Sequence, residues 1–294
     1  MTYFLLSLAS IFWGGNYVVG SVLVKTANPL LLSFLRWLLT SALLLGLYRK
    51  FIPGNLPKIR KNFGVIFILA LLGQVMFPTT LYVGLQYTSA LNAAIYLSAT
   101  PAVVLLINKL FFKEKITKSN ILGVSLSTFG VLFLLLKGNI LDLSKFKNIN
   151  SGEVWTIISA LSWAFYCSFL RLKDKTINGK AFLTTCSVIG TIILLPLTIV
   201  YCHYYNPVES FSGYFEIGFL SGLIYLVLFP SWLAYLFWNK GILEIGSTRG
   251  EIYTHLIPLS GGLFSVLFLG VSLESFHAIS SIFILLGIYF CSKK

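Results

Sequence analysis

Gly84-Leu-Gln-Tyr-Thr-Ser-Ala-Leu-Asn-Ala-Ala-Ile-Tyr96 has a counterpart 157 residues further on, Gly241-Ile-Leu-Glu-Ile-Gly-Ser-Thr-Arg-Gly-Glu-Ile-Tyr253. Four pairs of residues coincide at this offset: Gly84 with Gly241, Tyr96 with Tyr253, Pro101 with Pro258 and Gly130 with Gly287. The matched glycines and prolines argue against a chance similarity between two apolar sequences. The chain therefore contains an internal repeat, and this repeat determines how the rest of the sequence is interpreted.

The composition indicates a membrane protein. Of the 294 residues, 57% are hydrophobic and 11% are charged, whereas soluble domains carry about 45–50% and about 25%. A soluble fold cannot bury that much apolar surface, so we expect part of it to face lipid. The net charge of +13 then indicates basic cytoplasmic loops rather than a nucleic-acid partner. The four cysteines form no close CxxC pair, and we expect packed thiols.

Ten apolar runs are long enough to cross a bilayer, which needs about 20 helical residues per crossing. The longest loop between them, residues 138–152, has 15 residues, too few for a soluble catalytic domain. The runs are Tyr3–Val24, Leu30–Tyr48, Gly64–Gln86, Thr88–Phe112, Asn120–Lys137, Glu153–Arg171, Ala181–His203, Phe215–Trp238, Ser247–Gly270 and Ser275–Cys291.

Each copy of the repeat holds five of these runs. The first five-helix repeat would occupy residues 1–137, a linker loop residues 138–152 and the second repeat residues 153–294. Because five is odd, the two copies must lie in opposite orientations, an arrangement typical of secondary transporters. The sequence therefore predicts an all-α integral membrane protein with ten transmembrane helices in two inverted five-helix repeats.

Lysine and arginine set the expected orientation. With the N-terminus in the cytoplasm, the segments on that side hold 17 Lys and Arg residues and the opposite segments hold 4, while Arg36 lies inside a run. Cytoplasmic loops of membrane proteins carry such an excess. We therefore expect a multi-pass protein of a bacterial cytoplasmic (inner) membrane, with both termini in the cytoplasm.

Short motifs recur in order along the chain. They are Phe12-Trp13-Gly14-Gly15-Asn16-Tyr17, Pro29 followed by Leu35-Arg36-Trp37, Gly84-Leu85-Gln86-Tyr87-Thr88-Ser89-Ala90 followed by Thr100-Pro101, and Lys113-Glu114-Lys115. The second half repeats the pattern with Trp163, Gly241, Pro258 and Glu274. In this order the motifs resemble the EamA branch of the drug/metabolite transporter superfamily over nearly the whole chain.

The resemblance implies ten helices and a central cavity lined by runs 1, 3, 4, 6, 8 and 9. It also implies transport of amino acids, related metabolites or drug-like compounds. The second half departs from the first, since it has no Leu-Arg-Trp counterpart and its Phe229–Gly241 stretch is longer than Phe77–Gly84. These departures argue against an exact two-fold symmetry of the site.

The candidate substrate-binding residues are aromatic, amide and ionisable side chains deep in the runs. A Tyr or Trp facing lipid there would leave its polar atom unpaired, so we expect these rings to face the interior. Whether they line a cavity or pack against each other stays open. The candidates are Trp13, Asn16, Tyr17, Gln74, Tyr82, Tyr96, Trp163, Tyr166, Trp232, Tyr235, Glu251 and His255.

Three ionisable residues lie within runs, where a charge is costly. Arg36 has two possible functional roles, to attract an anionic group or to gate the outer mouth. The structural alternatives, which are favoured, are that it snorkels to headgroups or pairs structurally. Glu251 and His255 are spaced i, i+4 and would share a face of a helix that Pro258 kinks. They would bind substrate or a coupling proton. The alternatives are a Glu251 solvated or paired at the inner interface and a His255 bonded to a carbonyl freed by Pro258.

The spacing Gly218-xxx-Gly222 predicts close approach of another helix, and a homodimer face is an alternative. We therefore expect either a monomer or a weak homodimer. The lipid bilayer and a small-molecule substrate are the expected partners, with a proton as a candidate coupling ion.

Enzyme motifs do not occur in the sequence. It has no HExxH, GxSxG or P-loop, and its two aspartates, Asp142 and Asp174, lie in loops. We therefore expect no enzyme activity, no cofactor, no metal site and no nucleic-acid binding. A gradient would drive alternating access around a midplane cavity, with small zwitterionic or aromatic compounds, amino acids above all, as substrates. A lipid or amphiphile flippase or drug exporter that uses the same cleft is the alternative.

Overall fold

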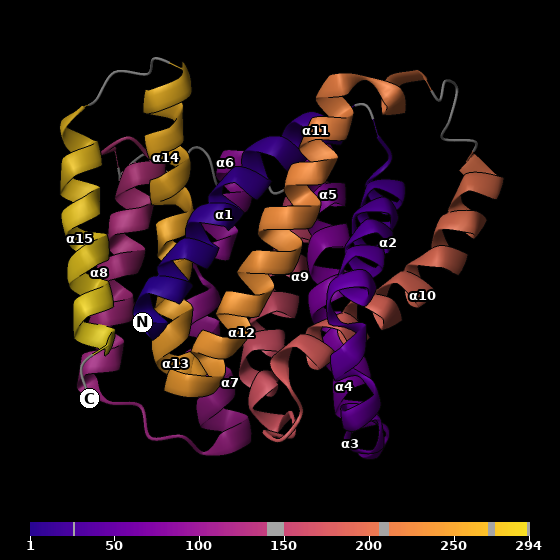
Figure 1. The fold of residues 1–294 in the computed structure, drawn as a ribbon. Helices are drawn as coiled ribbons and strands as arrows, with labels where there is room; N and C mark the ends of the chain where they lie inside the picture. The colour runs from indigo at the N-terminus through magenta and orange to yellow at the C-terminus, as the bar shows by residue number, and fades with distance from the viewer. Residues whose placement is uncertain (26, 140–149, 206–211, 270–273, 293–294) are drawn as a thin grey trace.

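The computed structural model describes residues 1–25, 27–139, 150–205, 212–269 and 274–292. In this part of the chain all regular secondary structure is helical (Figure 1). The elements of the first half are α1 (Thr2–Leu23), α2 (Pro29–Tyr48), η1 (Arg49–Phe51), η2 (Pro53–Asn55), α3 (Leu56–Lys61), α4 (Phe63–Ala70), η3 (Leu71–Met76), α5 (Phe77–Tyr87), α6 (Ala90–Leu97), α7 (Thr100–Phe112) and α8 (Lys118–Leu135). Those of the second half are α9 (Ser151–Phe169), η5 (Leu170–Leu172), α10 (Gly179–Tyr205), η6 (Ser212–Phe215), α11 (Ile217–Leu226), η7 (Val227–Leu233), α12 (Ala234–Ile245), α13 (Ser247–Gly250), η8 (Glu251–His255), α14 (Leu256–Leu269) and α15 (Ser275–Ser292).

Nine helical stretches among the described residues are long and apolar enough to cross a membrane. They are Thr2–Leu23, Pro29–Phe51, Phe63–Tyr87, Ala93–Phe112, Lys118–Leu135, Ser151–Leu172, Gly179–Tyr204, Ile217–Ile245 and Ser275–Ser292. Each overlaps one of the runs predicted from the sequence. The remaining run, predicted over Ser247–Gly270, contains three helices in tandem, α13, η8 and α14, and the longest of them has 14 residues.

Helix irregularities recur at the 157-residue spacing found in the sequence. The π-helix η3 covers residues 71–76, which the offset moves to 228–233, and the π-helix η7 covers residues 227–233. The break between α6 and α7 at residues 98–99 moves to 255–256, where η8 meets α14. Both halves therefore interrupt their helices at matching positions.

Proline is one cause of these interruptions, because it has no N–H and cannot bond the carbonyl four residues earlier. In the fourth span Pro101 leaves the Leu97 carbonyl without its helical partner. The Thr100 hydroxyl donates to that carbonyl at 2.7 Å, so the helix resumes as α7 without an unpaired oxygen in the membrane interior.

Helices α8 and α15 pack side by side through glycine (Figure 1). A Cβ added to Gly287 would lie 2.5 Å from the Gly123 carbonyl oxygen and 2.5 Å from the Ser127 Cβ. Only hydrogen fits at this contact, so the two backbones approach closely, as small residues allow in membrane helices. The predicted close approach at Gly218-xxx-Gly222 holds for Gly222, which faces Leu23 of α1. It is wrong for Gly218, because the space beside Gly218 is open.

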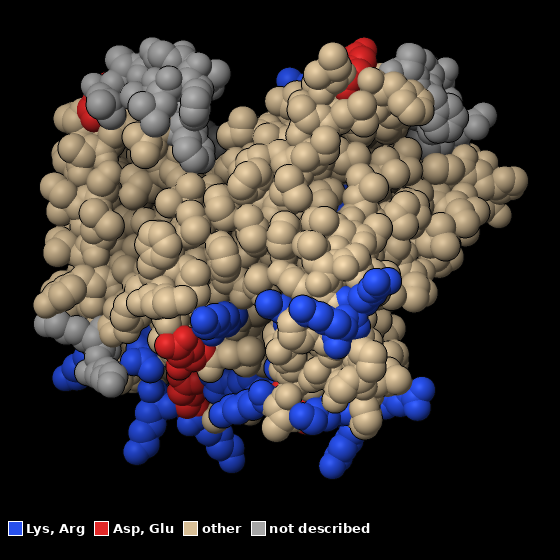
Figure 2. All heavy atoms as spheres, viewed as in Figure 1, with Lys and Arg blue, Asp and Glu red and all other residues tan. Residues whose placement is uncertain are grey.

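Charge is distributed unevenly between the two ends of the bundle. Lys and Arg side chains gather where α3, α7 and α13 lie (Figure 2). We call this the basic end. The first turn of α1 and the last turn of α15 both point toward it (Figure 1).

Candidate functional site

Seven aromatic side chains from both halves form a cluster in the middle of the bundle. The Trp13 ring lies 4.9 Å from Trp163, 5.8 Å from Tyr235 and 5.0 Å from Trp238, measured between ring centroids. Further ring contacts extend the cluster to Trp37, Phe77 and Tyr166. All seven side chains are buried. The predicted interior aromatics Trp13, Trp163, Tyr166 and Tyr235 thus pack against one another in this state.

Arg36 lies beside this cluster and is 1% exposed. Its Nε donates to Ser231 Oγ at 2.5 Å, and its Nη1 donates to Asn16 Oδ1 at 3.1 Å and to Tyr82 Oη at 2.7 Å. The guanidinium carbon lies 5.4 Å from the Trp37 ring centroid. Within the described residues no Asp or Glu forms an ion pair with it. The predicted alternative of snorkelling to headgroups is therefore wrong, whereas the structural pairing expected for Arg36 takes the form of hydrogen bonds to neutral side chains.

The π-helix η7 explains how Ser231 reaches Arg36. Pro230 lies inside η7 and has no N–H to offer the Leu226 carbonyl four residues earlier, and the Ser231 hydroxyl donates to that carbonyl at 2.7 Å. The same hydroxyl oxygen is then free to accept from Arg36. Ser231, in the π-helix η7 of the second half, thereby bonds the guanidinium of Arg36 in the first half.

Glu251 lies beside the cluster at Trp163 and is fully buried. Its Oε1 accepts from Trp163 Nε1 at 3.0 Å, whereas its Oε2 has no hydrogen-bond partner among the described residues. The predicted alternative of a solvated Glu251, or one paired with Arg249, is therefore wrong. Ring contacts run from Trp37 through Tyr235 to Trp163, so aromatic side chains separate Arg36 from Glu251.

His255 lies on the same short helix as Glu251 but does not share its face. Both residues belong to the 3₁₀-helix η8, in which residues three apart eclipse, so an i, i+4 pair diverges. The His255 Nε2 lies 2.8 Å from the Ser98 carbonyl oxygen. A carbonyl only accepts, so Nε2 carries the proton, and Nδ1 is left without a partner in the described structure. The expectation of a shared face is wrong because it assumed α-helical geometry.

The remaining candidates divide between the cluster and its surroundings. Asn16, Tyr82 and Gln74 are buried, and Tyr82 donates to Asn16 Oδ1 at 3.1 Å. The Gln74 side-chain amide lies 3.2 Å from the Leu69 and Ala70 carbonyls of its own helix. Tyr17 is 5% exposed and lines a cavity described below.

Trp232 and Tyr96 do not belong to the central cluster. Trp232 is half-buried and donates to Tyr48 Oη at 3.1 Å, and Tyr96 is half-buried and donates to Glu153 Oε2 at 3.1 Å. Trp232 lies one residue after Ser231 in η7, where π-helical geometry turns the two side chains differently from an α-helix. The spacing of Trp232 and Tyr235 predicts one shared face of the eighth run, but in the structure only Tyr235 belongs to the central cluster.

Several residues of the site were not among the candidates. They are Trp37, Ser231, Trp238, Cys167 and Asn239. Trp238 donates from Nε1 to the Cys167 sulfur at 3.2 Å, and Tyr166 donates to Asn239 Oδ1 at 2.7 Å. Pro230-Ser231, a proline followed by a hydroxyl in an apolar run, is the one sequence signal that indicates such a site.

Hydrogen bonds and one ion pair join the two halves at the basic end. Arg171 forms an ion pair with Glu114 Oε2 at 2.5 Å, and the Thr248 hydroxyl donates to Glu114 Oε1 at 2.5 Å. The Asn108 amide donates to Ser247 Oγ at 2.9 Å and to Thr248 Oγ1 at 2.8 Å. We call these five residues the latch.

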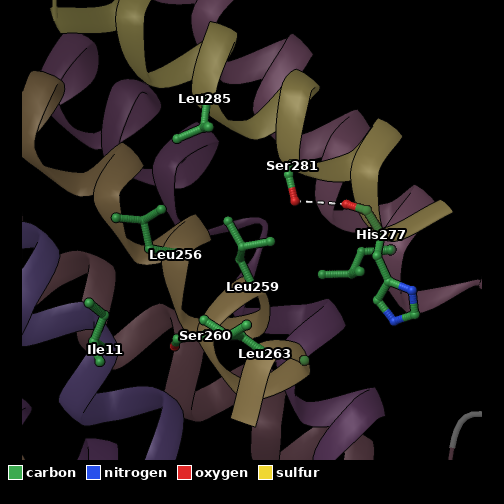
Figure 3. A pocket seen from close by; sticks show the side chains of 10 residues that line it. Ile11, Leu256, Leu259, Ser260, Leu263, His277, Ser281 and Leu285 are labelled. Atoms are coloured by element: carbon green, nitrogen blue, oxygen red, sulfur yellow. Dashed lines mark hydrogen bonds between the residues drawn. The ribbon is translucent and has the colours of Figure 1, made fainter. Parts of the chain in front are cut away.

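Cavities flank the cluster on other sides. One of about 360 Å³ lies at the seam between α1, α14 and α15, and five of its ten lining residues are leucines (Figure 3). The Ser281 hydroxyl there donates to the His277 carbonyl oxygen at 2.7 Å. A second cavity of about 370 Å³ lies near Tyr17, Pro258 and Lys137. These apolar walls fit a hydrocarbon better than a small polar solute.

Metal-binding potential is low in this part of the chain. The described residues contain no group of three His, Cys, Asp or Glu side chains that could hold a metal ion. The four cysteines are free thiols, and Cys167, Cys186 and Cys291 are buried.

Comparison with known proteins identifies the class of molecule. The model of the EamA-like transporter family matches residues 1–136 and again residues 150–293. The chain therefore belongs to the EamA-like transporter family, whose members are integral membrane transporters.

Individual relatives agree with this assignment. The chain is 28% identical to the uncharacterized transporter YyaM of Bacillus subtilis, over 97% of this chain and 92% of that one. It is also 28% identical to an uncharacterized transporter of Archaeoglobus fulgidus, over 100% of this chain and 98% of that one. A solved structure titled "Crystal structure of protein" superposes with a TM-score of 0.72 at 15% identity, covering 97% of this chain and 94% of that one. The last match concerns the fold alone.

Proposed function

We propose that this chain is a secondary transporter of small zwitterionic metabolites, with amino acids that carry aromatic or apolar side chains as the favoured class. The arrangement of Arg36, the aromatic cluster and Glu251 carries the proposal. A buried guanidinium without an acidic partner suits a carboxylate, because Arg binds carboxylates through charge-assisted hydrogen bonds. A buried carboxyl group with one free oxygen suits an ammonium group. The rings between them suit an apolar side chain, and their faces also attract cations.

The mechanism we propose is alternating access between two inverted five-helix repeats, residues 1–137 and 153–294, joined by the linker 138–152. The duplicate family match, the paired π-helices and the paired helix breaks support this division. Ser98 and His255 occupy equivalent positions at the 157-residue offset and bond to each other. The contact therefore lies where an axis relating two such repeats would pass, and rocking of one repeat against the other would strain it.

We infer that the state described here is closed at the basic end, where the latch joins the two repeats. Under the positive-inside rule this end is cytoplasmic, and both termini are then cytoplasmic. The latch joins Asn108 and Glu114 of the first repeat to Arg171, Ser247 and Thr248 of the second. Opening toward the cytoplasm requires these bonds to break, and we propose that substrate binding near Arg36 shifts this equilibrium.

Counterflow in proteoliposomes tests the function. Liposomes loaded with an unlabelled amino acid mixture should accumulate a labelled aromatic amino acid, and empty liposomes should not. A lipid or amphiphile flippase is the second candidate, because the seam cavity of about 360 Å³ has an apolar wall. If a labelled lipid crosses the bilayer and no amino acid exchanges, the flippase is correct and the amino acid proposal is wrong.

A further inference from the structure

The largest of the cavities described for this chain lies at the basic end, apart from the aromatic cluster. It has a volume of about 630 Å³, within the range of small-molecule sites. Its wall combines the loop after α9, the start of α10 and one face of α12. Four lysines line it, Lys173, Lys175, Lys180 and Lys240, against one acid, Glu244. We call this cavity the basic vestibule.

Among the described residues, no acid forms an ion pair with a lysine of the basic vestibule. Lys175 and Lys240 are exposed and form no hydrogen bond or ion pair within the described residues. Lys173 is buried, and its Nζ donates to the Asp174 and Ile177 carbonyls at 3.0 and 2.8 Å. Burial lowers the pKa of Lys173, because the cavity wall removes water from its ammonium group. An anion in the vestibule would stabilise the charged form of this lysine.

Lysines at a cytoplasmic surface occur in most membrane proteins, but the basic vestibule also contains a buried polar side chain. Asn239 lines the vestibule and is 5% exposed. Its Oδ1 accepts from Tyr166, but its Nδ2 has no acceptor among the described residues. A buried donor without a partner is costly. Nδ2 itself lies beneath the floor of the vestibule, so an acceptor oxygen of a ligand would satisfy this donor once the atoms that cover it shift.

We propose that the basic vestibule is a binding site for a phosphate group. Four lysines and one glutamate leave an excess of three positive charges, which matches a multiply charged anion better than a single carboxylate. Lysine binds phosphate as a point charge, and Lys175 and Lys240 are free to do so. The phosphate belongs either to a soluble metabolite or to the headgroup of an anionic phospholipid, whose chains would lie along the half-buried Leu236, Phe237 and Leu243.

The proposal does not depend on the identity of the transported solute. Asn239 touches the central cluster through Tyr166, and Tyr166 stacks on Trp163 with ring centroids 5.2 Å apart. A phosphate bound to Asn239 would therefore be linked through two hydrogen bonds and one ring contact to Trp163, which donates to Glu251.

Equilibrium binding of radiolabelled inorganic phosphate to the purified protein in a neutral detergent tests the soluble source. Retention of phosphatidylglycerol against phosphatidylcholine, counted by native mass spectrometry after extraction from mixed nanodiscs, tests the lipid source. Each Lys→Gln change at Lys175 or Lys240 should weaken binding about fivefold, since a lysine near a phosphate surface contributes roughly a factor of this size. The double variant should lose about 25-fold on the same basis.

Lys118→Gln is the matched control, because Lys118 is an exposed lysine outside the vestibule on α8. It should bind as the wild type does. Asn239→Asp replaces the free donor by an acceptor of the same shape and should weaken phosphate binding at least tenfold. Equal affinities of the wild type and the Lys175/Lys240 double variant for both probes would overturn the proposal. An Asn239→Asp protein that binds normally would overturn the role of the vestibule floor.

Discussion

Replacing Arg36 by methionine should separate stability from transport. Methionine has a similar reach and no charge, and it fills irregular space in a packed core. Arg36 is 1% exposed and bonds to Ser231, Asn16 and Tyr82. If the role of Arg36 is structural, its loss should unfold the protein; if its role is to bind substrate, the protein should fold and fail to transport.

The structure indicates that folding tolerates the change, because no partner of Arg36 loses its last hydrogen bond. The Ser231 hydroxyl still donates to the Leu226 carbonyl at 2.7 Å, and Tyr82 still donates to Asn16 at 3.1 Å. Hydrogen bonds to a charged group contribute about 1.5–3 kcal/mol each. Against three of them stands a desolvation cost of several kcal/mol for burying the ion. We therefore expect the free energy of unfolding to change by no more than about 2 kcal/mol.

Transport should change far more than stability. Loss of a charge-assisted hydrogen bond to a substrate carboxylate removes about 1.5–3 kcal/mol, which corresponds to a fall of about 10- to 100-fold in counterflow rate at subsaturating substrate. Arg36→Lys should give an intermediate rate, because lysine keeps the charge but not the planar fork. Arg49→Met is the matched control, since Arg49 is exposed in η1 directly after the same transmembrane helix.

Two measurements decide the matter: thermal unfolding in detergent and counterflow in proteoliposomes at equal protein density. A loss of stability of about 3–5 kcal/mol in Arg36→Met, the cost of breaking a buried charged network, would show that Arg36 is structural. A stable variant with wild-type counterflow would refute the assignment of Arg36 to the substrate carboxylate.

Three further outcomes are expected. Gly287→Ala should lower the free energy of unfolding by about 1–3 kcal/mol, because the new methyl would lie 2.5 Å from the Gly123 carbonyl oxygen. Gly46→Ala is the control and should leave stability unchanged, because the space beside Gly46 is open. Equal melting temperatures of the two variants would contradict the close packing of α8 on α15. His255→Gln should keep the wild-type pH–rate profile, because the His255 Nε2–H donates to the Ser98 carbonyl and a glutamine amide can do the same. Glu251→Gln should flatten the pH–rate profile if transport is proton-coupled. The reverse result would make His255 the proton carrier. The Thr176 N–H and hydroxyl lower the pKa of Asp174, so its loop gains stability above the unfolded pKa of about 3.9 and loses it as the pH falls through the lower folded value. Hydrogen exchange of residues 174–178 should be faster in Asp174→Asn than in the wild type at pH 7, and the difference should shrink as the pH falls through the folded pKa. Equal rates at pH 7 would contradict this.

Much of the fold could be predicted from the sequence because lipid imposes a strong constraint. A bilayer demands about 20 apolar residues per crossing and satisfied backbone groups throughout. Hydropathy therefore located nine spans that the structure contains, with their ends shifted by a few residues. The candidate aromatics Trp13, Trp163 and Tyr235 were also predictable, since a polar ring atom that deep must find a partner inside the bundle.

The errors at the site have a common cause in helix geometry. Glu251 and His255 diverge because η8 is a 3₁₀-helix, and Trp232, inside the π-helix η7, lies outside the cluster to which Tyr235 belongs. Helical-face arguments assume 3.6 residues per turn, and three or more residues of another helix type rotate every side chain that follows. Proline marks where such a change is possible, but the sequence alone does not say which helix type relieves the missing N–H.

The same irregularities are what allow ionisable groups into the membrane interior. Pro230 frees the Leu226 carbonyl, Ser231 satisfies it, and the second function of that hydroxyl is to hold Arg36. In a regular α-helix a serine hydroxyl bonds the carbonyl three or four residues earlier, whereas the Ser231 hydroxyl bonds the carbonyl five residues earlier and accepts from Arg36 in that position. The prediction from the sequence thus fails where the chain departs from regular helix to hold a charge. In a transporter, a substrate finds polar groups within the bilayer at such positions.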